Sequence, residues 1–452
     1  MNNVFIVSLG CPKNLVDTEV MLASLEHAGY ILTDTPEEAE VIVVNTCGFI
    51  QPAVEEAVDT ILEMAEYKEA KPGTRLVVTG CMVQRYGTAL LEELPEVDLF
   101  IGLDDFPGID RLLAEETNGP RLITAPGAAN FLMDSSYARS ISTPFFRSFL
   151  KITEGCDNRC TYCMIPSIRG PLRSREIADL VREAQALEQT GVRELCLIAQ
   201  DLTAYGTDLQ NGETLVRLLE ALLSETSIPW LRLLYAYPSG VSDELLQLMA
   251  ENARILPYLD VPFQHVSDSV LQNMNRPYGT ALLDGLITRI RSYLPDCVLR
   301  TTLMVGFPGE TKEDVEIMLE ALKRWQLDHV GVFQYQDEEG SAAALLPGKI
   351  EDQEKAVRYE QVMSIQADIS RERLQRYVVR IEPVLVEGIS EESELLLEGR
   401  TRYQAPDIDG CVYITSGQFN PGDIVELRIT EAHTYDLVAE EVDLLEDEEN
   451  GG

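Results

Sequence analysis

The most constraining feature of the sequence is a short stretch, residues 155–163, that holds three cysteines in the spacing C-x3-C-x2-C. A strand-like run at residues 149–153 leads directly into it. A closed zinc site takes four ligands, usually from two separated C-x2-C pairs, whereas thiolates hold the irons of a cubane iron–sulfur cluster. Cys156, Cys160 and Cys163 on such a cluster would leave one iron free to bind another group. Three buried core cysteines, or a zinc knuckle with a distant fourth ligand, are the other interpretations.

The N-terminal region predicts a second cysteine site. Apolar strand-like runs alternate with helical patterns at residues 4–9, 14–28, 41–45, 52–67, 75–79, 83–94 and 97–101. This alternation predicts a parallel sheet with helices on both faces. The first three strands lead directly to Cys11, Cys47 and Cys81, and parallel strands end at one edge of the sheet. Half-buried thiols would explain any one of these cysteines, but three at one topological position predict a second cluster with an open iron.

The middle of the chain predicts an open barrel. Residues 119–146 are rich in loop-forming residues and are expected to be a linker. Strands are expected at residues 149–153, 194–200, 230–237, 258–262, 298–305 and 329–335. Helices are expected at residues 174–189, 213–223, 243–253, 281–293 and 312–325. Six such units are too few for a closed eight-stranded barrel, so we expect a partial (βα)6 barrel with its site at the carboxyl ends of the strands.

Three turns after these strands are candidates for contact with a cofactor or substrate. They contain Gln200 and Asp201, then Gln264 and His265, and a glycine turn that begins at Gly306. A lone glycine turn is weak evidence for a nucleoside site. For His265 a packed or hydrogen-bonded residue is the default interpretation.

The C-terminal region, residues 377–445, shows short alternating runs that predict a small antiparallel β-barrel. It is strongly acidic: from Ile381 onward the chain has three Arg, no Lys and nineteen Asp or Glu, a net charge of −16. Residues 446–452 are expected to form a disordered acidic tail.

The composition limits the partners of this 452-residue chain. Its formal net charge is −40, which opposes binding to nucleic-acid phosphates and favours a basic partner. No apolar run approaches the length that spans a bilayer, and the N-terminus has no signal-peptide pattern. Nine cysteines without an export signal indicate a reducing cytoplasm, where clustered cysteines more often bind metal or react. Of the three cysteines outside the triplets, Cys196 and Cys297 lie in apolar strands and are expected to be core residues.

The spacing of the central cysteines, with Tyr162 before the third, resembles that of the radical S-adenosylmethionine (SAM) enzymes. The order of the three regions is similar to that of the methylthiotransferases within that superfamily. This resemblance implies an α/β fold of three domains. They are an α/β methylthiotransferase domain at 1–118, a partial radical SAM barrel at 147–376, and a TRAM β-barrel at 377–445.

The resemblance also implies cofactors and site residues. The family carries two [4Fe–4S] clusters and uses SAM. By position, the central triplet matches the radical SAM cluster, and the N-terminal triplet matches the auxiliary cluster. The open iron of the radical SAM cluster would bind SAM. The resemblance gives weaker grounds for expecting SAM or substrate contacts from Tyr162, Gln200, Asp201, Gln264 and Gly306.

One of the two main branches of this family modifies adenosine in tRNA. The other, called RimO, modifies the β-carbon of an aspartate in small-subunit ribosomal protein twelve (S-twelve). The opening motif at residues 8–14, Ser-Leu-Gly-Cys-Pro-Lys-Asn, resembles the RimO branch, where tRNA enzymes tend to have Gly-Cys-Gln-Met-Asn. The motif at 45–50 and the pairs Gln200-Asp201 and Gln264-His265 fit the same branch. An acidic C-terminal barrel also suits a basic ribosomal protein.

The resemblance implies that one SAM donates a methyl group to sulfur at the auxiliary cluster and a second yields the radical that attacks the aspartate. A reductant such as flavodoxin or ferredoxin is expected, with no direct nucleic-acid substrate and no membrane. The nearest alternative is a tRNA adenosine methylthiotransferase. An iron–sulfur electron carrier and a plain RNA-binding module are the others, and the acidic barrel argues against the last.

Overall fold

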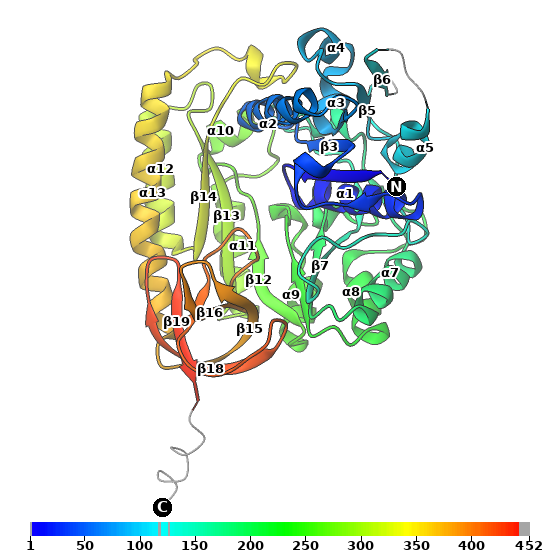
Figure 1. Ribbon diagram of the computed structural model, residues 1–452. Coiled ribbons are helices and arrows are strands. Elements are labelled where there is room, and N and C mark those ends of the chain that lie inside the picture. Colours follow the sequence, from blue (N-terminus) through cyan, green and yellow to red (C-terminus); the bar gives the residue numbers. More distant parts are fainter. Residues whose placement is uncertain (1, 116–118, 125–126, 443–452) are drawn as a thin grey trace, which may run out of the picture.

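The computed structural model describes residues 2–115, 119–124 and 127–442. Figure 1 shows three parts, with the N-terminal domain at the top, the central strands in the middle and the C-terminal barrel at the bottom. No helix within the described ranges is both long and apolar enough to cross a membrane.

The N-terminal domain is a six-stranded parallel sheet in the order β2-β1-β3-β4-β5-β6. Its strands are β1 (Asn3–Ser8), β2 (Ile31–Leu32), β3 (Val41–Thr46), β4 (Arg75–Gly80), β5 (Leu99–Ile101) and β6 (Arg121–Ile123). Its helices are α1 (Pro12–His27), α2 (Gln51–Ala70), α3 (Cys81–Tyr86), α4 (Leu90–Glu93) and α5 (Ile109–Ala114). Residues of β3 and β4 are almost all buried, as expected for central strands covered on both faces.

The central domain is an open six-stranded parallel sheet in the order β14-β13-β12-β11-β10-β7. Its strands are β7 (Arg147–Lys151), β10 (Glu194–Ile198), β11 (Trp230–Leu233), β12 (Ile255–Asp260), β13 (Val298–Val305) and β14 (His329–Gln334). A separate short hairpin pairs β8 (Thr153–Glu154) with β9 (Arg173–Ser174). The helices are α6 (Ile165–Ile168), α7 (Ile177–Gln189), α8 (Leu215–Glu225), α9 (Asp243–Glu251), α10 (Asp268–Asn273), α11 (Thr280–Tyr293), α12 (Lys312–Trp325) and α13 (Asp352–Leu374). The predicted partial barrel is therefore confirmed.

The C-terminal domain is a closed five-stranded barrel in the order β15-β16-β17-β19-β18. The strands are β15 (Ile381–Ser390), β16 (Ser393–Thr401), β17 (Val412–Ile414), β18 (Ile424–Ala432) and β19 (Leu437–Glu441). Four of its pairings are antiparallel, as predicted, but β17 and β19 are parallel. The predicted acidic tail at 446–452 lies outside the described residues.

The three domains share buried contacts. One apolar cluster contains residues of α1, of the inner face of the central strands and of the C-terminal barrel. The junction between the barrel and the central sheet also holds ion pairs: Glu194 at the start of β10 contacts Arg232 and Arg400, each at 2.6 Å. The C-terminal barrel therefore packs into the open side of the central sheet near the amino ends of its strands (Figure 1).

The structure adds two short edge strands to the predicted N-terminal sheet. Residues Arg121–Ile123, inside the expected linker at 119–146, form β6 and extend the N-terminal sheet beside β5. The two-residue β2 is the other edge strand. Both are edge strands, which pair on one side only. Neither contains the apolar run that is typical of a central strand.

Candidate functional site

The three N-terminal cysteines meet at one edge of the sheet. Cys11, Cys47 and Cys81 follow β1, β3 and β4, which are adjacent in the sheet order. The thiols are close enough that each of Cys11 and Cys47 acts electrostatically on Cys81. Tight glycine turns make this approach possible: Gly10 has φ +91°, and an added Cβ there would lie 2.8 Å from the Cβ of Cys47.

Burial and nearby cations act in opposite directions on the ionisation of this triplet. Burial works to raise the pKa of the Cys11 thiol, but Lys13 and Arg169 outweigh it, and the pKa is lowered. Burial raises the pKa of Cys81 to about 12, although Arg169 works against that rise. The site therefore combines one buried and two half-buried thiols with two cations that favour the thiolate form, which is the form that binds metal.

Arg169 connects the triplet to the central domain. Its guanidinium is buried, and its Nε–H donates to the Cys81 Sγ at 3.3 Å. Its terminal nitrogens donate to Asn14 Oδ1 and Asp17 of α1 and to both oxygens of Glu154 in β8, at 2.5–3.0 Å. Burial alone would raise the pKa of Glu154, but Arg169 and Lys151 hold it at about 2. The network is a continuous set of buried charges behind the cysteines.

The second triplet lies on the loop that follows β7 and β8. The pKa of Cys156 is raised to about 11, and that of Cys163 to about 12, chiefly by burial. Cys160 acts electrostatically on both, so the three thiols are neighbours. The loop is fixed from two sides, because the Cys156 N–H donates to the Gly170 carbonyl at 3.1 Å and the Thr161 N–H donates to the Met274 carbonyl at 3.1 Å.

Tyr162, a predicted site residue, points to a buried arginine rather than to open space. Its hydroxyl accepts a hydrogen bond from Arg276 Nη2 at 2.6 Å. The Arg276 guanidinium also lies 4.8 Å from the ring centroid of Tyr237 and 5.8 Å from that of Tyr278. Arg276 acts on Cys163 as an attractive charge, so each triplet has its own arginine.

Of the next predicted pair, Asp201 supports the cysteine loop. Its Oδ1 caps the turn at Leu202–Ala204 by accepting from the N–H groups of Thr203 and Ala204. Its Oδ2 accepts from Asn158 Nδ2 at 2.7 Å, inside the loop of the second triplet. Both carboxylate oxygens thus have protein partners. Gln200 lies beside it, half-buried, and its contact with a cofactor stays a prediction.

Gln264 and Gly306 lie in turns that follow β12 and β13, and both have positive φ angles. Gln264 has φ +69°, which is unusual for a residue with a side chain, and its backbone bridges to β13. Such strain concentrates at functional sites. The Gly306 N–H donates to Glu310, which lies 3.4 Å from His265 and 2.7 Å from Arg358. His265 is completely buried and accepts from the Ser267 N–H at Nδ1, so its contacts are those of a packed, hydrogen-bonded residue.

The two triplets lie close to one another. Cys81 packs in one small apolar cluster with Met164, the residue after Cys163. Beyond β11, Tyr235 contacts Lys13 of the first site, and Tyr237 contacts Arg276 of the second. Two residues of chain span at most about 7 Å. The end of β11 therefore reaches both sites.

Both triplets fit the thiolate ligands of a [4Fe–4S] cluster in number, proximity and charged surroundings. Among the residues described, no three His, Cys, Asp or Glu side chains converge in the manner of ligands to a single metal ion. A cubane does not require such convergence, because each thiolate binds a different iron.

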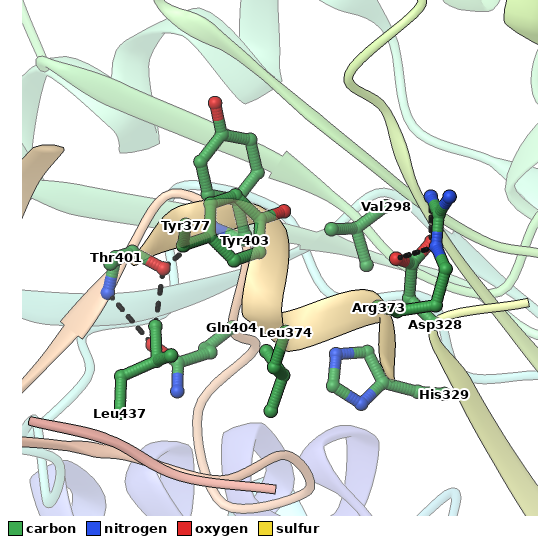
Figure 2. Close-up of a pocket in the computed structure, with 10 residues that line it drawn as sticks. All are labelled: Val298, Asp328, His329, Arg373, Leu374, Tyr377, Thr401, Tyr403, Gln404 and Leu437. Carbon is green, nitrogen blue, oxygen red and sulfur yellow. Dashed lines mark hydrogen bonds and ion pairs between the residues drawn. The ribbon is translucent and has the colours of Figure 1, made fainter. Parts of the chain in front are cut away.

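One enclosed cavity lies away from both cysteine triplets. Figure 2 shows it between the start of β13 and β14, the end of α13 and the C-terminal barrel. Its volume is about 10 Å³, room for about one water molecule. It is closed by the stacked rings of Tyr377 and Tyr403, 4.7 Å apart, and by the Arg373–Asp328 ion pair. We interpret it as a packing defect at a domain junction.

Sequence reasoning predicted that the cysteines of each triplet lie together, as they do, but it missed the basic residues that surround them. These are Lys13, Lys151, Arg169 and Arg276. Arg169 and Arg276 are buried in an acidic chain, but a single basic residue has no spacing signature, and its acidic or thiol partners come together only in the folded chain.

Three family models match the chain in the order of its domains. Residues 3–102 match the uncharacterized protein family UPF0004, residues 150–322 match the radical SAM superfamily, and residues 379–442 match the TRAM domain.

Solved structures support the same fold. The radical SAM methyltransferase TsrM from Kitasatospora setae, with cobalamin and a [4Fe–4S] cluster bound, aligns with a TM-score of 0.57 at 15% identity. The alignment covers 76% of this chain and 74% of that one. At this identity the likeness concerns the fold alone.

Close relatives among curated proteins match nearly the whole chain. The ribosomal protein uS12 methylthiotransferase RimO of Desulfotalea psychrophila is 53% identical over 96% of this chain and 98% of its own length. RimO of Myxococcus xanthus is 49% identical over 98% of this chain and 92% of its own, and RimO of Citrifermentans bemidjiense is 48% identical over 97% and 98%. With this identity over three consecutive domains, the chain belongs to the RimO family of radical SAM methylthiotransferases, which use SAM and [4Fe–4S] clusters.

Proposed function

We propose that this enzyme adds a methylthio group to the β-carbon of an aspartate in small-subunit ribosomal protein uS12. The observation that carries the proposal is the pair of cysteine triplets, on separate domains, that the end of β11 joins within two residues. Methylthiolation of an unactivated carbon needs a radical source and a sulfur donor near one substrate atom. The relatives, which are ribosomal protein uS12 methylthiotransferases, support the same choice.

In this proposal, the central triplet of Cys156, Cys160 and Cys163 holds the radical SAM cluster and the triplet of Cys11, Cys47 and Cys81 holds the auxiliary one. Bound there, the clusters and SAM supply the radical, the methyl group and the sulfur. The protein holds the groups in line, excludes water and compensates charge. Arg169 and Arg276 are placed for charge compensation, because each is buried against one triplet.

The C-terminal barrel supports a basic protein as substrate rather than tRNA. Its described residues 381–442 carry fourteen acidic residues, three arginines and no lysine. The turn that joins β15 and β16 exposes Glu391, Glu392 and Glu394, and Ile389 and Leu395 beside it are 68% and 92% exposed. An exposed surface of carboxylates and aliphatic side chains suits a lysine- and arginine-rich protein. The same surface would repel phosphates.

Three further assignments belong to this proposal. The enzyme receives electrons from a small reductant such as flavodoxin or ferredoxin. It works in the cytoplasm, where ribosomal proteins are made and assembled. It has no direct nucleic-acid substrate and no membrane partner.

Mass spectrometry of uS12 and of bulk tRNA from a strain that lacks this gene tests the proposal. We expect the methylthio group to be absent from the ribosomal protein and unchanged in tRNA. A plasmid copy should restore the modification, whereas copies with alanine at either cysteine triplet should not. Loss of a methylthio group from tRNA with uS12 unchanged would overturn the assignment and favour the tRNA branch.

A further inference from the structure

Lys13 lies beside the first cysteine triplet, at a place in its helix that is unfavourable for a cation. It lies in the first turn of α1, at the positive end of the helix dipole, where a cation is unfavourable. Its exposed fraction is only 5%. Neither a hydrogen bond nor an ion pair joins its ammonium group to any residue in the described part of the chain. Within the described part of the chain, its Nζ is not among the fully enclosed side-chain nitrogens that lack a partner, so a ligand of opposite charge can reach it.

The neighbours of Lys13 place it at the mouth of the central barrel. Its Nζ lies 3.6 Å from the ring centroid of Tyr235, which follows β11 and has φ +67°. On its other side it attracts the thiolate of Cys11. The ammonium group thus lies between the first cysteine triplet and the carboxyl edge of the barrel that carries the second.

Nearby carboxylates are already paired. Asp260, which accepts from the Tyr235 N–H at 3.3 Å, forms an ion pair with Arg300 at 3.0 Å. Asp17, one turn along α1, is held by Lys151 and Arg169. Neither carboxylate is therefore free to pair with Lys13, which leaves its ammonium group available to a carboxylate of the substrate.

We propose that Lys13 binds the side-chain carboxylate of the aspartate that the enzyme modifies. This inference rests on the proposed function. The reacting β-carbon is one bond from that carboxylate carbon, so an ion pair to Lys13 would hold the β-carbon beside the first triplet and facing the second. The ring of Tyr235 stabilises the cation before the substrate arrives. Lys13 is then a specificity-determining residue that selects aspartate over asparagine.

The test compares Lys13→Met with the wild type in binding, without reductant, so that no turnover occurs. Methionine keeps the length and apolar stem of lysine and removes the charge. The probes are purified uS12 and the same protein with asparagine in place of the modified aspartate. We expect the wild type to bind the aspartate form roughly tenfold or more tightly than the asparagine form, as for a hydrogen bond to a charged group. Lys13→Met should bind both forms with the weaker affinity, and Lys13→Arg should keep part of the preference.

Lys151→Met is the matched control. Lys151 is also a buried lysine near the first triplet, but it is paired with Asp17 and Glu154. This variant should keep the preference for aspartate. Melting temperature separates the two roles further: Lys13→Met loses an unpaired buried cation and should melt no lower than the wild type, whereas Lys151→Met should melt lower.

Three outcomes would overturn the inference. A preference for aspartate that survives in Lys13→Met would show that another group reads the carboxylate. A loss of iron from Lys13→Met would assign the lysine to the cluster instead of the substrate. Equal binding of both forms by the wild type would show that the carboxylate is not recognised. If the wild type binds uS12 and prefers aspartate but never modifies it, the proposed function fails while the carboxylate site stands.

Discussion

At the scale of single residues, Gly10 shows how closely the backbone fits the first cysteine triplet. Both Gly10 and Gly29 have left-handed φ angles, +91° and +87°, and they flank the same helix α1. A Cβ at Gly10 would lie 2.8 Å from the Cβ of Cys47, whereas a Cβ at Gly29 would meet no atom within 4 Å. Alanine at either position carries a similar backbone strain, of about 1 kcal/mol. Only the change at Gly10 also displaces Cys47, a proposed cluster ligand.

We therefore expect Gly10→Ala to lose about four of the roughly eight irons of the reconstituted enzyme, one cubane's share. Gly29→Ala should keep all of them. Iron analysis after anaerobic reconstitution measures this, and melting temperatures show whether the two variants are equally strained. Full iron in Gly10→Ala would mean that Cys47 is not a cluster ligand or that its turn is more compliant than the contact suggests.

Arg169 predicts a property of the first cluster that activity alone would not reveal. Hydrogen bonds to ligand sulfur raise the reduction potential of an iron–sulfur cluster. Arg169→Gln removes both the charge and the geometry of the bond to Cys81, so the potential should become more negative, by the order of 60 mV if about 1.4 kcal/mol is lost. Lys151→Met removes a cation from the same carboxylates but no hydrogen bond to a thiol. The shift in reduction potential that it causes should therefore be smaller.

A redox titration followed by electron paramagnetic resonance measures these potentials. It should use a background with alanine at Cys156, Cys160 and Cys163, so that only the first cluster titrates. Equal shifts in Arg169→Gln and Lys151→Met would mean that the general field of the network matters and the bond to Cys81 does not.

The contrast between the cysteines and these cations explains what was predictable at this scale. Spacing identified Cys156, Cys160 and Cys163, and topology joined the three N-terminal cysteines. Lys13 and Arg169 carry no such pattern. Their roles depend on contacts that form only in the folded chain, and those of Arg169 cross a domain boundary.

At the scale of the elements, the two triplets lie on independent supports, a sheet edge in one domain and a loop after β7 in the other. This independence predicts two separable clusters. Alanine at Cys156, Cys160 and Cys163 should halve the iron and abolish SAM cleavage, whereas alanine at the other three should halve the iron and leave cleavage largely intact.

The buried cysteines outside the triplets provide the control for that experiment. Cys196 and Cys297 are 0% and 2% exposed, as expected from their apolar strands, and their replacement by alanine should leave the iron content unchanged. Full iron in either triple variant would contradict the assignment of ligands.

Periodicity located the central strands but not all of their ends. The strand predicted at 298–305 agrees with β13, whereas the one predicted at 230–237 ends at Leu233 in the structure. Residues 234–237 are apolar or aromatic and so continue the pattern. They leave the sheet because Tyr235 takes a left-handed conformation against Lys13. The predicted end of this strand is therefore wrong in a segment whose backbone turns beside the candidate site.

At the scale of the whole molecule, Glu194 ties the central sheet to the C-terminal barrel. Burial alone would raise its pKa, but Arg400 and Arg232 hold it at about 2, below the ordinary value of 4.5. A lowered folded-state pKa stabilises the protein above pH 4.5, and this stabilisation is lost as the pH falls through about 2.

Glu194→Gln should lower the free energy of unfolding by about 3–5 kcal/mol near neutral pH, because two buried arginines lose their partner. The difference from the wild type should narrow between pH 4.5 and 2. Denaturant unfolding across this range measures it. Glu426→Gln, at an exposed position of β18, should have little effect at any pH, and equal losses in both variants would contradict the argument.

The same junction decides how substrate recognition should be tested. Removing the chain from Tyr377 onward would strip Arg400 from Glu194 and expose the inner face of the central sheet. Such a truncation would weaken the radical SAM domain itself, so its loss of substrate binding would not report on the acidic surface. Substitutions of exposed charges leave this junction intact.

The acidic turn between β15 and β16 is the part of the barrel best suited to that test. Changing Glu391, Glu392 and Glu394 to lysine reverses three exposed charges. If this turn attracts the basic ribosomal protein, we expect roughly tenfold weaker binding at low salt, as for several modest charge contacts. The difference should shrink as salt rises, because the screening length falls from about 10 Å at 0.1 M to about 3 Å at 1 M.

The control places the same charge change on another exposed face. Glu313, Glu316 and Glu320 are exposed on α12, on the outside of the central domain (Figure 1). Changing them to lysine alters the net charge by the same amount, so it should reproduce any effect of overall charge but none of local attraction. Binding titrations with uS12 at several salt concentrations compare the two variants. Equal weakening by both would assign the attraction to the net charge of the molecule, and no weakening by the variant of the β15–β16 turn would remove this turn from substrate recognition.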